Sequence, residues 1–83
     1  MPSQRIDTFI LKVEATESVE DMLLPIVAMD SFSAEMSRDG LTEEEQIVEA
    51  TEAKGILEGL ESSDVRKAFI GVLQTWISTR TLA

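Results

Sequence analysis

The 83-residue chain contains no cysteine, no histidine and no tyrosine. Without cysteine it has no disulfide, no thiolate nucleophile and no thiolate metal ligand. Without histidine it lacks the commonest general base and the commonest transition-metal ligand. None of its sixteen acidic residues stands in an apolar setting of the kind that raises the pKa of a catalytic carboxyl. We therefore predict that the protein is not an enzyme and has no catalytic, cofactor or metal site.

Positive charge is also scarce. Seven Lys and Arg against sixteen Asp and Glu give a net charge of −9. A negative surface repels nucleic-acid phosphates and anionic lipid headgroups, so we expect neither direct nucleic-acid binding nor membrane docking. The uncharged run from Met22 to Met29 is far shorter than the roughly 20 residues that span a bilayer. No apolar leader follows Met1, which predicts a cytoplasmic protein.

The first of four predicted helices spans about residues 3–16. Ile6, Phe9, Ile10 and Val13 recur at the spacing of one helix face. Residues 6–13 also alternate as a strand would, with Phe9, Leu11 and Val13 on one side. We favour a helix because no partner strand is evident elsewhere, but the pattern itself leaves helix and strand open.

The second predicted helix opens at Ser18, with Asp21 in a position close to that of a capping box. Pro25 interrupts it, because proline lacks an amide donor and clashes with the preceding turn. A kink or break is expected there. Gly40 fits the left-handed residue that ends many helices.

Clear signals also mark the start of the third and fourth predicted helices. Thr42 and Glu45 form a capping box for a helix that runs to about Leu60. Within it, Gly55 marks either close packing or a weak spot. Ser62 or Ser63 caps a last helix that runs to about Ser78, after which the tail is expected to fray.

These helices are joined by short connections, which favour antiparallel neighbours. The expected fold is therefore all-α: a single domain over residues 1–83, built as a small antiparallel bundle of three to four helices, with the second helix kinked or broken at Pro25.

An unusually wide apolar face on the fourth predicted helix gives the main functional hypothesis. It covers about half of the circumference, more than the stripe that an ordinary surface helix needs. We interpret the protein as a non-catalytic protein-protein interaction or regulatory module that forms a homodimer or binds another protein. The predicted partner-binding residues are Phe69, Ile70, Leu73, Trp76 and Ile77.

Two other functions are kept as alternatives. Glu45, Glu49 and Glu52 form an acidic face on the third predicted helix, which could imitate a phosphate backbone and occupy a basic site on another protein. The sequence Asp30-Ser31-Phe32 resembles the Asp-Ser-Leu attachment site of acyl carrier proteins, although Ala28 replaces the glycine usual two residues before the aspartate. That resemblance implies a carrier modified on Ser31 at the start of its second helix.

Overall fold

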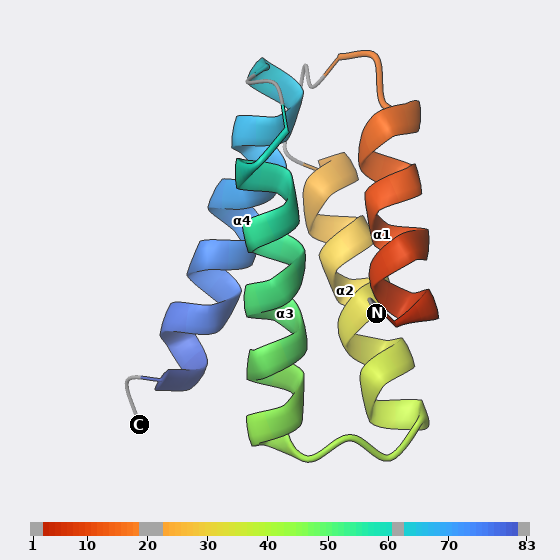
Figure 1. The fold of residues 1–83 in the computed structure, drawn as a ribbon, viewed down its shortest axis with the longest axis vertical. Helices are drawn as coiled ribbons and strands as arrows, with labels where there is room; N and C mark the ends of the chain where they lie inside the picture. Colours follow the sequence, from red (N-terminus) through yellow and green to blue (C-terminus); the bar gives the residue numbers. More distant parts are fainter. Residues whose placement is uncertain (1–2, 19–22, 61–62, 82–83) are drawn as a thin grey trace.

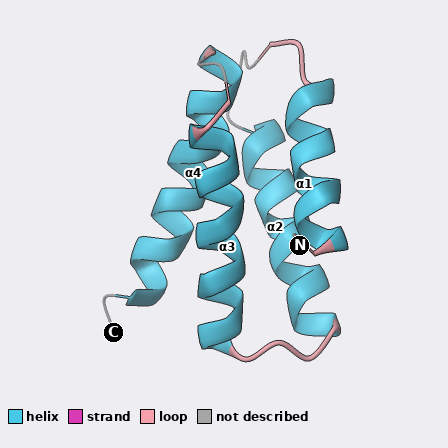
Figure 2. Cartoon of the chain, in the orientation of Figure 1, coloured by secondary structure: helices cyan, strands magenta, loops and turns pink. Residues whose placement is uncertain are grey.

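The computed structural model describes residues 3–18, 23–60 and 63–81. These residues form four helices and no strand: α1 (Gln4–Ala15), α2 (Leu23–Arg38), α3 (Glu43–Glu58) and α4 (Asp64–Thr81). Figures 1 and 2 show the helices running alternately up and down. The predicted all-α bundle is confirmed, and residues 6–13 are helical.

Side-chain caps mark the starts of α1, α3 and α4. The Ser3 hydroxyl accepts a hydrogen bond from the amide of Ile6 at 3.1 Å. The Thr42 hydroxyl accepts from the amide of Glu45 at 3.2 Å, while the Glu45 carboxylate accepts from the amide of Thr42 at 2.8 Å. This reciprocal pair is the predicted capping box. At the start of α4, the Ser63 hydroxyl accepts from the amide of Arg66 at 3.1 Å.

Gly40 ends α2 in the left-handed conformation, with a φ of 81°. The amide of Leu41 donates to the carbonyl of Met36 and that of Gly40 to the carbonyl of Ser37, both at 3.1 Å. This pattern is a Schellman motif, which satisfies two carbonyls that the helix end would leave free. The predicted C-cap is therefore confirmed.

Two predicted helix ends are wrong by a few residues. α3 ends at Glu58 rather than about Leu60. α4 continues to Thr81 rather than ending at about Ser78. Its last turn is held because the Arg80 guanidinium lies 3.8 Å from the centre of the Trp76 ring and donates to the Trp76 carbonyl. The cap at Ser18 involves Asp21, which lies outside the described residues.

Pro25 is the third residue of α2 as the structure describes it. Proline is tolerated in a first turn because the amides there lack intrahelical partners. Residues 19–22 lie outside the described part, so the kink or break at Pro25 stays a prediction.

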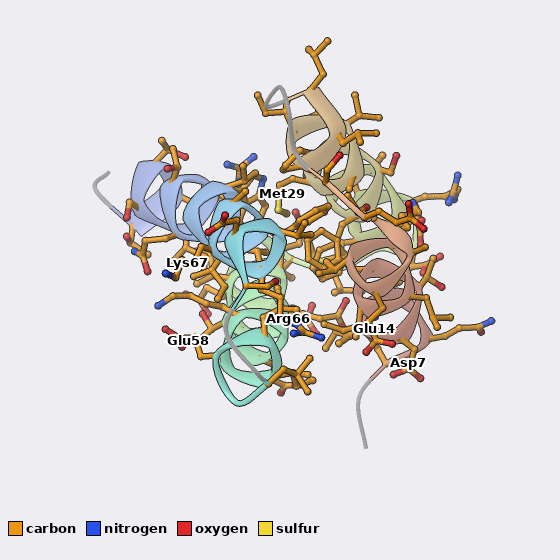
Figure 3. The ribbon with its side chains drawn as sticks, turned by 90° about the horizontal axis from the view of Figure 1, so that it is seen from above. Asp7, Glu14, Met29, Glu58, Arg66 and Lys67 are labelled. Atoms are coloured by element: carbon orange, nitrogen blue, oxygen red, sulfur yellow. The ribbon has the colours of Figure 1, made fainter. Side chains whose placement is uncertain are left out.

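The helices surround the core in the order α1, α2, α4, α3. Extensive contacts join α1 with α2, α3 with α4, α1 with α3 and α2 with α4, whereas α2 and α3 contact each other little. Figure 3 shows α2 and α3 on opposite sides of the core. The short connection between them therefore crosses the end of the bundle, and the expectation that it joins close neighbours is wrong.

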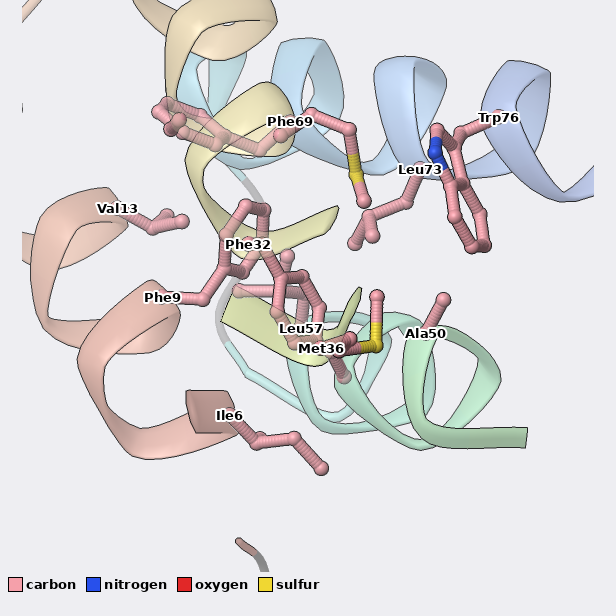
Figure 4. Packing of buried hydrophobic residues seen from close by; sticks show 13 residues of the cluster. Ile6, Phe9, Val13, Phe32, Met36, Ala50, Leu57, Phe69, Leu73 and Trp76 are labelled. Carbon is pink, nitrogen blue, oxygen red and sulfur yellow. The ribbon is translucent and has the colours of Figure 1, made fainter. Parts of the chain in front are cut away.

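The core contains an aromatic cluster contributed by three helices. The Phe9 ring centre of α1 lies 5.0 Å from that of Phe32 in α2 and 5.8 Å from that of Phe69 in α4 (Figure 4). Ala50 and Ala53 of α3 are fully buried, and these small side chains let neighbouring helices approach α3 closely. The buried apolar residues are Ile6, Phe9, Val13, Ala28, Met29, Phe32, Met36, Ala50, Ala53, Leu57, Phe69, Leu73 and Trp76.

Candidate functional site

The structure places the predicted partner-binding residues of α4 mainly inside the bundle. Phe69 and Leu73 are 1% and 0% exposed, and Trp76 is 9% exposed. Ile70 and Ile77 are half-buried and pack against the core. The wide apolar face of α4 is therefore largely covered by its own neighbours, and a partner could reach only its half-buried edges.

The predicted acidic face of α3 is partly engaged in structural contacts. Arg5 of α1 donates two hydrogen bonds to the Glu49 carboxylate, at 2.7 and 2.9 Å. Its guanidinium also donates to Asp39, just after α2, at 2.6 Å. The Glu49 and Asp39 carboxylates raise the pKa of Arg5 above its ordinary value. Glu52, the last of the three predicted acidic residues, forms no ion pair with any described residue.

Glu45 belongs to the capping box, and its environment shifts its titration. The Thr42 amide donates to the carboxylate, which lowers the pKa of Glu45 below its ordinary value. A lowered pKa in the folded state stabilises the fold above the unfolded-state pKa, and this contribution is lost as pH falls through the folded-state pKa. The geometry of Glu45 is thus that of a helix cap.

Ser31 lies in the middle of α2, eight residues after Leu23. Its side chain is half-buried and faces a groove shared with Phe69. The resemblance to carrier proteins implies a serine at the start of the second helix. The position of Ser31 departs from that expectation, so the structure adds no support for a carrier.

Among the residues that the structure describes, four exposed large apolar side chains lie together on the first turns of α2. We define the α2 patch as Leu23, Leu24, Ile26 and Val27, which are 64%, 56%, 44% and 57% exposed. The neighbouring residues Pro25, Ala28 and Met29 are buried. An uninterrupted apolar run goes all the way round a helix, so a bundle that covers one side must leave the others in water.

Two apolar grooves flank the α2 patch. The groove between α2 and α4 has a volume of about 340 Å³, and Figure 3 shows Met29 between these two helices. It is lined by Ile26, Met29, Asp30, Gly71, Val72, Thr75 and Trp76. The groove between α1 and α2 has a volume of about 290 Å³ and is lined by Lys12, Ala15, Thr16, Leu24, Val27, Ala28, Ser31 and Phe69. The patch is therefore a ridge between two depressions, a shape that another helix can fit.

This surface was missed by reasoning from the sequence, although a signal for it exists. Residues 23–27 are five consecutive apolar residues, Leu-Leu-Pro-Ile-Val. Such a run exceeds what one buried stripe can use, so some of its side chains must face water.

Three comparisons with known proteins give no guide to the function. No protein-family model matches it, and no curated protein or solved structure is significantly similar to it. In the part that the structure describes, no helix has the length and apolar character needed to cross a membrane. Among the same residues, no group of three or more acidic side chains converges in a way that could hold a metal ion.

Proposed function

We propose that this protein is a non-catalytic protein-interaction module whose contact surface is the α2 patch. The single observation that carries the proposal is the exposure of four neighbouring aliphatic side chains on one helix. Other large exposed apolar residues lie apart from it, on other helices or after α3: Leu11, Val48 and Leu60. Isolated residues of this kind are normal on surfaces, whereas a continuous apolar surface between grooves is typical of an interface.

Burial of the α2 patch would contribute favourably to binding. Fully burying one aliphatic side chain contributes about 1.5–3 kcal/mol, and the four residues are each about half exposed. Covering them would thus contribute about 3–6 kcal/mol before the cost of association. The net charge of −9 makes an anionic membrane an unfavourable occupant, so a protein surface is the proposed one.

A site-specific photo-crosslinker tests this proposal. We would place it at Val27 and, as a control, at Thr51, which is exposed on α3. The labelled protein would be irradiated in cells of the organism that carries the sequence. We expect defined protein adducts from position 27 and none from position 51. Equal adduct yields from both positions, or none from either, would overturn the proposal.

The adducts also need to depend on the apolar surface itself. Leu24→Ser combined with Ile26→Ser, with the crosslinker kept at position 27, should remove most of the adduct. Both side chains are more than 40% exposed, so the bundle should still fold. Circular dichroism would verify the helix content of each variant.

A further inference from the structure

We infer that the occupant of the α2 patch is a second copy of this chain, bound so that the two α2 helices lie parallel and Lys12 of each copy pairs with Asp30 of the partner subunit. This inference rests on the proposed function, because it names the partner of the same surface. It is carried by the charges on either side of the patch, which are opposite in sign.

The α2 patch is a face on which two such acidic molecules can meet. Each copy carries a net charge of −9, so most of its surface repels a second copy. Residues 23–29 include no charged side chain. A pair of copies that meet on this face therefore buries apolar area, and Asp30 is the first carboxylate that follows this area along α2.

Charges of opposite sign line the two grooves beside the patch. Lys12 lines the groove on the α1 side, and Asp30 lines the groove on the α4 side. Neither side chain forms an ion pair with any residue that the structure describes. Lys12 shares its groove with Ser31, the neighbour of Asp30, so the two charges lie at a similar level along α2.

Symmetry then decides the relative orientation of the copies. A two-fold axis parallel to α2 exchanges the two sides of the patch and keeps the level along the helix. The α1 side of each copy then faces the α4 side of the other. Two equivalent ion pairs form, each between Lys12 of one copy and Asp30 of the partner subunit. A two-fold axis perpendicular to α2 would instead bring the two Lys12 sides together. Charge complementarity therefore selects the parallel pair.

The size of the surface sets the strength of the pairing. The patch and its two grooves involve fewer residues than the roughly 20–30 a side of a standard interface. A small interface of this kind is expected to be weak and concentration-dependent. We expect a dissociation constant of roughly 0.1–1 mM, with monomers at low concentration and dimers at high concentration.

Charge exchange tests the pairing. Sedimentation equilibrium between about 5 μM and 1 mM would be measured for the natural chain, Lys12→Asp, Asp30→Lys and the double variant. We expect each single variant to weaken dimerisation at least tenfold and the double variant to return to within about threefold of the natural chain. Single variants without effect, or a double variant as weak as the singles, would overturn the pairing.

A matched pair of apolar substitutions tests the surface. Val27→Asp should abolish dimerisation, because it places a charge in the α2 patch, whereas Val48→Asp on α3 should not. The two substitutions are matched, since the two valines are 57% and 58% exposed. Equal effects would overturn the use of the α2 patch. A natural chain that stays monomeric to 1 mM would overturn self-association, and crosslinks from position 27 to a different protein would then leave the proposed function standing.

Discussion

Arg5 connects three parts of the chain that lie far apart in the sequence. It belongs to the first turn of α1 and bonds to Glu49 of α3 and to Asp39, just after α2. Its side chain is 21% exposed and that of Glu49 is 12% exposed. A bidentate bond of this kind is stronger than an ordinary exposed ion pair, because both charges are partly shielded from water.

We expect Arg5→Met to lower the free energy of unfolding by about 1–2 kcal/mol, more than the 0.2–1 kcal/mol of an exposed pair. Lys54→Met is the control, because Lys54 and Glu58 are 3.8 Å apart on one helix and Glu58 is 53% exposed. That variant should cost less than about 0.5 kcal/mol. Urea unfolding measures both, and equal losses would show that the Arg5 pairs are no stronger than a surface pair.

The ends and interiors of the helices differ in their need for glycine. Gly40 has a φ of 81°, which a side chain with a Cβ adopts only with strain. Gly55 is exposed within α3, and a Cβ built there meets nothing within 4 Å. The sequence left close packing and a weak spot open for Gly55, and the structure shows that nothing packs there.

These two glycines predict opposite outcomes for the same substitution. Gly40→Ala should destabilise the protein by about 1–2 kcal/mol. Gly55→Ala should stabilise it by about 0.5–1 kcal/mol, because alanine is the better helix former. Thermal unfolding followed by circular dichroism compares them. Shifts of the same sign would contradict the assigned backbone roles.

The whole molecule depends on a thin core that the aromatic cluster holds together. An 83-residue protein has a total stability of only about 4–12 kcal/mol. Phe9 is 2% exposed and contacts rings from two other helices, so it contributes to several interfaces at once.

We expect Phe9→Ala to cost about 3–5 kcal/mol. At about 4–8 °C per kcal/mol for a domain of this size, the midpoint of thermal unfolding should fall by at least about 12 °C. Leu11→Ala, on the same helix but 65% exposed, is the control and should change the midpoint by only a few degrees. Similar losses for both would mean that the cluster is not the centre of the core.

The sequence by itself determined the helices, most of their ends and the chemistry that the chain lacks. Caps and turns depend on residues within a few positions of one another, as at Thr42 and Glu45 or at Gly40. Such signals act over one turn of helix, so helix ends can be predicted from residues that are close in the sequence. The identity of the core face of α1 was readable for the same reason, since its apolar residues repeat with the helix period.

Only the tertiary structure decided which apolar residues are covered. α4 has a wide apolar face and α2 has a continuous apolar run, so both helices have more apolar surface than one buried stripe requires. The order of helices around the core places α4 between α2 and α3. Phe69 and Leu73 are buried in this arrangement, whereas Leu23, Leu24, Ile26 and Val27 are left in water. Burial depends on neighbours that come from distant parts of the chain, and no local pattern specifies those neighbours.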